Sequence, residues 1–121
     1  MARYVLAVAF RGLAWLMVRN RVRGWEFAGG KVKPHETSEQ AAARECREET
    51  GCAFQPQAGF VFQDGEVFVG RLGQCGGRIT DPDIMEWAFV EELPIQLGFP
   101  REECEEIVGD ARRLADGLRL G

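Results

Sequence analysis

The sequence lacks the features that would place it in several common classes of protein. It has one histidine, and none of its four cysteines lies in a C-x-x-C pair, which excludes a Cys/His zinc site. No apolar run approaches the roughly 18 to 20 residues that a membrane span needs. Linkers, internal repeats and low-complexity tracts are also missing. The 121 residues suffice for one core and are too few for two, so we expect a single domain over residues 1–121.

A net positive charge is missing too. The formal charge is −4 and the isoelectric point is near 5.1, which argues against stable binding of nucleic acid. Residues 4–18 are rich in apolar side chains, but Arg11 and Gly12 interrupt them, and no basic start or small-residue cleavage site is visible. We interpret this stretch as two strands rather than a signal peptide, and we expect no membrane association.

The four cysteines are Cys46, Cys52, Cys75 and Cys104. Their spacing indicates neither a metal site nor a redox pair. We therefore predict that all four are reduced thiols, most of them buried. Because reduced thiols are typical of the cytoplasm, we predict a cytoplasmic protein.

The pattern of apolar residues predicts strands, a helix, more strands and a final helix. Val-rich and aromatic runs predict strands, Asp64-Gly65 predicts a hairpin turn, and the glycine-rich segment 73–77 predicts a loop. A 3,4-spaced apolar stripe predicts a helix that begins near Pro100. The expected strands are 3–10, 13–19, 25–27, 53–62, 66–72 and 84–90, with a short extension at 78–80. A mixed sheet packed between two helices would bury both helix stripes.

The stretch from Thr37 to Thr50 is the predicted first helix. Thr37 and Gln40 have the spacing of a capping box, and Gly51 suits a left-handed C-cap. On this helix Glu45, Glu48 and Glu49 fall within an arc of about 100°. Three carboxylates on one face repel one another, and a hard divalent cation would relieve that repulsion. The alternative is an ordinary solvated acidic face, in which Arg44 pairs with Glu48.

The region from Gly30 to Cys52 has the spacing G-x5-E-x7-R-E-U-x-E-E-x-G-U, where U is a bulky apolar residue. Cysteine, a small apolar substitute, occupies both U positions. All seven fixed positions are filled, by Gly30, Glu36, Arg44, Glu45, Glu48, Glu49 and Gly51. In this motif the sequence resembles the Nudix hydrolases. The resemblance implies an α/β/α sandwich, with a mixed sheet between helices, and hydrolysis of a nucleoside diphosphate linked to another group.

The resemblance also implies a metal site for Mg²⁺ or Mn²⁺. Its ligands would be Glu45, Glu48 and Glu49, together with a backbone carbonyl near Gly29 or Gly30. The general base varies within the family, and it would be a motif glutamate, such as Glu48, or a carboxylate from a later loop.

Other residues would support this chemistry. Arg44 would orient a motif glutamate, and Glu36 would tie the glycine loop to the helix. Asp81 is the favoured later carboxylate, ahead of Asp83 and Glu86, although an Asp-Pro turn explains it equally well.

The lead-in W-E-F-A-G-G-K resembles W-E-F-P-G-G-K of MutT-like nucleoside triphosphate pyrophosphohydrolases, with Ala28 in place of proline. On that resemblance the residues that would contact substrate are Arg19, Phe27, Gly29, Lys31 and Glu103. For the basic residues, plain solvation is nearly as good an explanation. For Phe27, core packing is the favoured explanation.

The implied reaction converts a nucleoside triphosphate, such as 8-oxo-dGTP, to the monophosphate and pyrophosphate. The open alternatives are another linked substrate (a nucleotide sugar, a dinucleotide or an RNA 5′ end) and a non-catalytic nucleotide-binding module. Nudix proteins are often dimers, so we expect a monomer or a homodimer.

Overall fold

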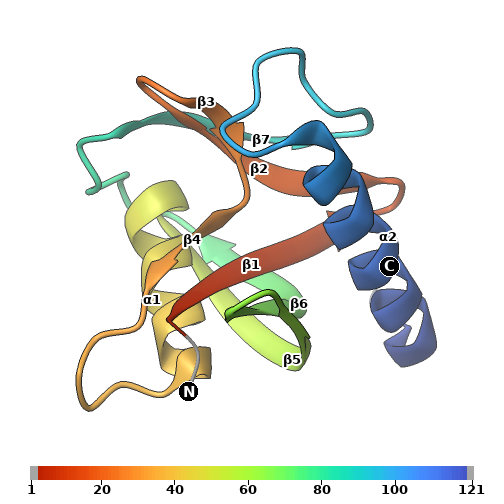
Figure 1. Cartoon of the computed structure of the whole chain (residues 1–121). Helices are drawn as coiled ribbons and strands as arrows, with labels where there is room; N and C mark the ends of the chain where they lie inside the picture. The colour runs from red at the N-terminus through yellow and green to blue at the C-terminus, as the bar shows by residue number, and fades with distance from the viewer. Residues whose placement is uncertain (1–2, 120–121) are drawn as a thin grey trace.

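A computed structural model describes residues 3–119 and shows a β-sheet with a helix on each face (Figure 1). The predicted domain limits, 1–121, therefore include four residues outside the described range. The strands are β1 (Tyr4–Arg11), β2 (Ala14–Asn20), β3 (Gly24–Glu26), β4 (Ala28–Lys31), β5 (Cys52–Phe62), β6 (Gly65–Cys75) and β7 (Ile84–Val90). The helices are α1 (Ser38–Thr50) and α2 (Arg101–Leu118).

The sheet is mixed, as predicted. Its order is β3-β2-β1-β6-β5, with β4 also paired to β1 and β7 to β2. Strand β1 runs parallel to β6 and antiparallel to β2 and β4, so it links all parts of the sheet. The β5–β6 hairpin turns at Gln63-Asp64, between the paired residues Phe62 and Gly65, which is one residue earlier than the predicted Asp64-Gly65 turn.

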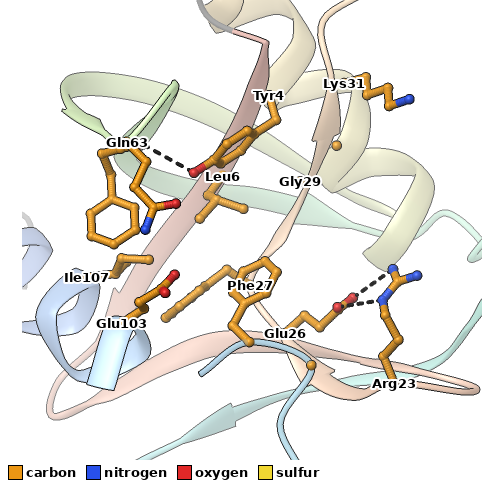
Figure 2. Close-up of a pocket in the computed structure, with 14 residues that line it drawn as sticks. Tyr4, Leu6, Arg23, Glu26, Phe27, Gly29, Lys31, Gln63, Glu103 and Ile107 are labelled. Carbon is orange, nitrogen blue, oxygen red and sulfur yellow. Dashed lines mark hydrogen bonds and ion pairs between the residues drawn. The ribbon is translucent and has the colours of Figure 1, made fainter. Parts of the chain in front are cut away.

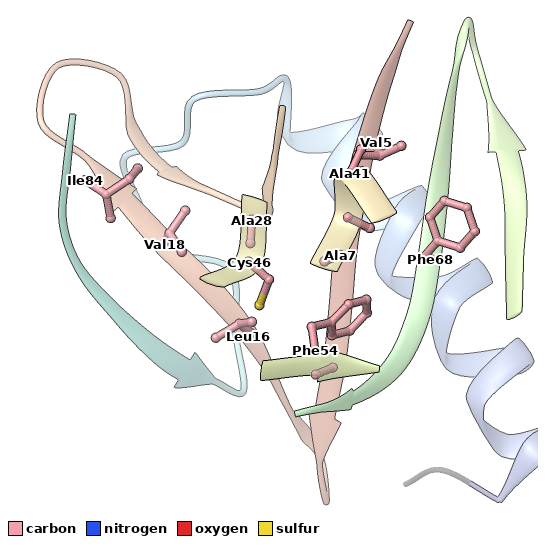
Figure 3. Packing of buried hydrophobic residues seen from close by; sticks show 12 residues of the cluster. Val5, Ala7, Leu16, Val18, Ala28, Ala41, Cys46, Phe54, Phe68 and Ile84 are labelled. Atoms are coloured by element: carbon pink, nitrogen blue, oxygen red, sulfur yellow. The ribbon is translucent and has the colours of Figure 1, made fainter. Parts of the chain in front are cut away.

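Two apolar cores lie on opposite faces of the sheet. Because side chains alternate along a strand, Val5 and Ala7 of β1 face α1, whereas Leu6 and Val8 face α2. Helix α1 contributes Ala41, Ala42 and Cys46 to the first core, shown in Figure 3. Helix α2 contributes Cys104, Ile107, Ala111 and Ala115 to the second core. The predicted α/β/α sandwich is confirmed.

The ends of α1 follow the predicted chemistry. The Thr37 hydroxyl accepts from the Gln40 N–H at 3.1 Å, and the Gln40 side chain accepts from the Thr37 N–H at 2.9 Å. Gly51 has φ 75° and its N–H donates to the Arg47 carbonyl at 2.8 Å. These caps fix the start and the end of the helix that carries the three glutamates.

The prediction of four free thiols is wrong. Cys52 and Cys75 form a disulfide, whereas Cys46 and Cys104 are free and buried. The two bonded cysteines are directly paired residues of β5 and β6. The predicted loop 73–77 is also wrong in part, because strand β6 continues to Cys75. The thiol argument for the cytoplasm no longer holds, and the localisation stays a prediction.

One smaller expectation also fails, and one charged residue is buried. Glu26 is buried, and Arg23 forms an ion pair with it at 2.8 Å. Segment 78–80 forms no strand; instead the Thr80 N–H donates to the Glu48 carbonyl at 2.8 Å. Neither α1 nor α2, the helices of the described chain, is both long and apolar enough to cross a membrane.

Candidate active site

Arg44 is the centre of the hydrogen-bond network on α1. Its guanidinium donates to both carboxylate oxygens of Glu36, at 2.7 and 3.0 Å, and to the Lys31 carbonyl at 3.0 Å. It also donates to Glu45 at 2.6 Å and to Glu48 at 3.3 Å. Through this one side chain, α1 is joined to the end of β4, to Glu36 in the segment before the helix and to two further motif glutamates.

The Glu36–Arg44 pair is strongly ionic. The hydrogen bonds from Arg44, supported by one from the Lys33 N–H, lower the pKa of Glu36 to about 2. The same pairing raises the pKa of Arg44. Bidentate pairs of this kind fix direction as well as distance. Arg44 therefore holds the Glu45 carboxylate in one orientation.

Three carboxylates converge beside this network. Oxygens of Glu45, Glu49 and Asp81 all lie within 4.8 Å of one another. Burial raises the pKa of Glu49 far above its ordinary range, and the negative charges of Glu45 and Asp81 raise it further. One backbone hydrogen bond opposes this shift, from the Gly29 N–H to Glu49 at 3.2 Å. A mutually repelling set of oxygen donors, of which Glu49 is buried and the other two are half-buried, fits a hard divalent cation such as Mg²⁺ or Mn²⁺.

Gly29 and Gly30 leave space for this cluster; they belong to strand β4 and not to the predicted glycine loop. A Cβ atom on Gly30 would lie 2.5 Å from the carboxylate of Glu45, so any side chain there would displace that glutamate. A Cβ atom on Gly29 would overlap the Val5 carbonyl of β1. The missing side chains therefore let β4 pair closely with β1 at Gly29 and approach Glu45 at Gly30.

Glu48 and Asp81 differ in their position relative to the carboxylate cluster. Glu48 is not a member of the group of three; its side chain is 37% exposed and touches Arg44. Its backbone carbonyl accepts from the Asp81 N–H at 3.1 Å, which ties Asp81 to the helix. The Asp81 carboxylate also accepts from the Asp83 N–H at 2.8 Å. Asp81 is thus both a turn residue and a member of the cluster.

A cavity of about 440 Å³ opens next to Gly29 and Gly30 of β4 (Figure 2). Its volume is in the range of small-molecule sites. The aromatic part of its wall is formed by Phe27 and Phe99, whose ring centres are 6.4 Å apart, and by Tyr4 and Phe62. Gly29 and Gly30 belong to both the cavity wall and the carboxylate site. The apolar cavity and the acidic cluster are therefore contiguous.

The polar groups of the cavity lie at two ends. In Figure 2, Lys31 and Arg23 lie on the side of α1, whereas Gln63 and Glu103 lie on the side of α2. Arg23 is 62% exposed and is anchored by Glu26. Its hydrogen bonds to Glu26 raise the pKa of Arg23, and the charges of Asp83 and Glu49 add smaller contributions.

The structure does not bring every predicted substrate residue to this cavity. Phe27, Gly29, Lys31 and Glu103 line it, but Arg19 does not. Arg19 forms an ion pair with Glu86 of β7 at 2.8 Å.

Sequence reasoning missed several cavity residues. Arg23 and Gln63 come from turns, and Tyr4 comes from the first residue of β1. For Arg23, the sequence signal was the glycine that follows it: Gly24 has φ 100°, a backbone conformation that favours glycine at a turn.

Comparison with known proteins agrees with this geometry. The family model described as NUDIX domain matches residues 2–108. The chain belongs to the Nudix family. The family prediction made from the Gly30–Cys52 motif is therefore confirmed.

Curated Nudix relatives match over part of their length. A protein of Bacillus subtilis (strain 168) named "Putative 8-oxo-dGTP diphosphatase YtkD" is 47% identical over 49 residues, which are 40% of this chain and 31% of that protein. A second protein of the same strain, named "Putative 8-oxo-dGTP diphosphatase", is 35% identical over 89 residues, 66% of this chain and 60% of that protein. Neither match spans two thirds of the relative.

A solved structure shows a similar fold. The Bacillus subtilis pyrophosphohydrolase BsRppH, solved as a mutant, aligns with a TM-score of 0.76 at 20% identity, over 99% of this chain and 85% of that one. At this identity the match supports the fold alone.

Proposed function

We propose that this Nudix protein is a metal-dependent nucleoside triphosphate pyrophosphohydrolase of the MutT-like type. The observation that carries the proposal is the contiguity of the carboxylate cluster with an aromatic cavity through Gly29 and Gly30. A nucleoside base in the cavity would leave its phosphates beside the cluster. The relatives named as 8-oxo-dGTP diphosphatases support this substrate class, with 8-oxo-dGTP as the first candidate.

In this proposal Glu45, Glu49 and Asp81 would hold Mg²⁺ or Mn²⁺, with Glu48 and a backbone carbonyl at Gly29 or Gly30 as further candidate ligands. When bound, the cation would neutralise phosphate charge and lower the pKa of water. Arg44 keeps Glu45 in place. Glu48, which is outside the group of three and partly exposed, would accept the proton of the attacking water.

The cavity residues supply positioning. Lys31 and Arg23 are exposed cations on the α1 side, and both would contact phosphate oxygens. Phe27 and Phe99 would pack against the base. Glu103 and Gln63 would hydrogen-bond its edge: a carboxylate accepts two hydrogens, which suits the N1–H and amino groups of a guanine-type base.

The test is a pyrophosphate-release assay with Mg²⁺ on 8-oxo-dGTP, dGTP, dATP, dUTP and ITP, beside ADP-ribose and dinucleotides assayed by phosphatase-coupled phosphate release. Release of pyrophosphate from a triphosphate would support the proposal. Activity on the second group alone would favour a Nudix hydrolase for another linked substrate. No activity with Mg²⁺ or Mn²⁺ would favour a nucleotide-binding module.

Base recognition has its own matched pair of variants. Glu103→Gln replaces the acceptor that lines the cavity, whereas Glu106→Gln changes an exposed residue of the same helix. We expect Glu103→Gln to reduce the preference for guanine-type over adenine-type substrates about tenfold or more, and Glu106→Gln to leave it unchanged. If both variants keep the same preference for guanine-type over adenine-type substrates, Glu103 does not take part in base recognition.

A further inference from the structure

The disulfide lies just after the end of α1, the helix that carries the motif glutamates. Cys52 begins β5, two residues after Thr50 ends α1, and Cys75 ends β6. Cys52 is fully buried, whereas Cys75 is exposed. The bond closes the open end of the β5–β6 hairpin, far along the strands from its turn at Gln63-Asp64. After Cys75 the chain runs through residues 76–83, without regular structure, to β7.

Segment 76–83 is attached to the end of α1 by backbone hydrogen bonds. The Gly77 N–H donates to the Gly51 carbonyl at 3.0 Å, and the N–H groups of Thr80 and Asp81 donate to the Glu48 carbonyl at 2.8 and 3.1 Å. The acceptors belong to the last turn and the cap of the helix, where carbonyls lack a partner within the helix. Gly51 permits this approach, because a Cβ atom there would overlap the Gly77 carbonyl.

Asp81 is the one carboxylate of the cluster that this segment supplies. Glu45 and Glu49 are fixed by α1 itself, but the position of Asp81 depends on how residues 76–83 lie against the helix. The end of β6 that precedes the segment is weakly held, since Gly73, Gln74 and Cys75 are all exposed and the hairpin register shifts between Cys52 and Phe54. The disulfide is the covalent link at that end.

We infer that the Cys52–Cys75 disulfide positions Asp81 in the carboxylate cluster, so that reduction of this bond weakens divalent-metal binding. The inference rests on the metal role of the cluster in the proposed function. It also means that the metal affinity of the protein depends on thiol redox conditions, although neither cysteine is a ligand. Losing a group that orients a metal ligand costs roughly 10- to 100-fold in metal affinity, and we expect about tenfold here.

The chemistry of reduction is ordinary thiol–disulfide exchange. A thiolate of a dithiol reductant attacks the sulfur of exposed Cys75; the S–S bond breaks and its electron pair leaves on the sulfur of Cys52, which takes up a proton. The second thiolate of the reductant then displaces Cys75, which is also protonated, and the reductant is oxidised to its disulfide. Two electrons enter the protein. Cys46 and Cys104 are buried, and burial raises both thiol pKa values to about 11, so they do not compete in this exchange.

The experiment measures Mn²⁺ affinity by electron paramagnetic resonance, without nucleotide, so that it does not depend on the substrate. Four samples are compared: wild-type protein and Asp81→Asn, each oxidised, and each reduced with dithiothreitol and then desalted without oxygen. Mass spectrometry of alkylated protein confirms the redox state. Cys75→Ser serves as a permanently open form, and thermal unfolding confirms that each sample is folded.

We expect reduction to weaken Mn²⁺ binding about tenfold in the wild type, and Cys75→Ser to match the reduced wild type. In Asp81→Asn, binding should be weak already and reduction should change it less than about twofold, because the affected ligand is gone. An equal fall on reduction in both backgrounds would show that the disulfide acts on stability and not through Asp81. No change in the wild type, or no disulfide after oxidation, would overturn the inference.

Failure of the redox inference and failure of the proposed function give different results. If Mn²⁺ binding is redox-dependent but no triphosphate is hydrolysed, the inference stands and the substrate assignment falls. If triphosphates are hydrolysed but the Mn²⁺ affinity is the same in the oxidised and the reduced protein, the substrate assignment stands and the inference falls. If the oxidised wild type binds no Mn²⁺, both the metal site and the inference are refuted.

Discussion

Replacement of Glu49 by glutamine should stabilise the metal-free protein at high pH and weaken its response to metal. Glu49 is 5% exposed and lies within 4.8 Å of the oxygens of Glu45 and Asp81. Its raised pKa means that the folded state keeps a proton that the unfolded chain has already released. Stability must therefore fall as the pH rises from the ordinary carboxylate range toward the raised pKa. Glutamine has the same shape and removes the charge.

The magnitude follows from Coulomb's law. Two unit charges 4.8 Å apart interact by about 3.5 kcal/mol at an effective dielectric constant of about 20. The hydrogen bond from Gly29 and sharing of a proton within the group reduce this repulsion. We therefore expect Glu49→Gln to raise the free energy of unfolding by about 1–3 kcal/mol at pH 9, and to change it little at pH 5, where Glu49 is protonated. For a chain of this length, about 1 kcal/mol corresponds to about 4 °C in Tm.

The assay is thermal unfolding in EDTA at pH 5 and pH 9, repeated with saturating Mg²⁺. In EDTA at pH 9 the variant should melt above the wild type, whereas Mg²⁺ should stabilise the wild type and have little effect on the variant. Glu39→Gln, an exposed change on the same helix, is the control and should behave like the wild type. A variant that melts below the wild type in EDTA at both pH values would refute the account of Glu49 as a strained metal ligand.

The remaining predictions concern turnover and thiols. Glu48→Gln should lower turnover about 10²- to 10⁴-fold with an unchanged circular dichroism spectrum, and full activity would remove Glu48 as the base. Asp81→Asn should lower the rate far more than Asp83→Asn, measured in the same pyrophosphate assay; similar small losses would leave Asp81 as a turn residue only. Native oxidised protein should show almost no thiol reactive with Ellman's reagent, and the denatured protein should show two before reduction and four after it. Four before reduction would contradict the disulfide.

The parts of the site that the sequence predicts are those built on short-range spacing. The capping box and the C-cap glycine mark α1 to within one residue, because the relevant hydrogen bonds join residues three or four apart. The Gly30–Cys52 motif gives Arg44, Glu45 and Glu49 on one helix face for the same reason. Alternating apolar residues likewise predict most of the strands, since the period of a strand is local.

The parts that escape prediction depend on contacts between distant segments. The disulfide follows from the register of a hairpin that brings residues 52 and 75 together. The burial of Glu26 depends on Arg23 across a turn, and on Gly98, where a Cβ atom would overlap the Glu26 carboxylate. The cavity draws its wall from β1, β4, the hairpin turn and α2, so no single stretch reveals Gln63 as a neighbour of Glu103.

The most direct test of the central claim is the identity of the products formed from 8-oxo-dGTP with Mg²⁺, separated by ion-exchange chromatography with pyrophosphate measured in parallel. The account predicts the nucleoside monophosphate and pyrophosphate in equal amounts, formed only with a divalent cation and lost in Glu48→Gln. Formation of the diphosphate with inorganic phosphate, or turnover that persists in EDTA, would contradict it.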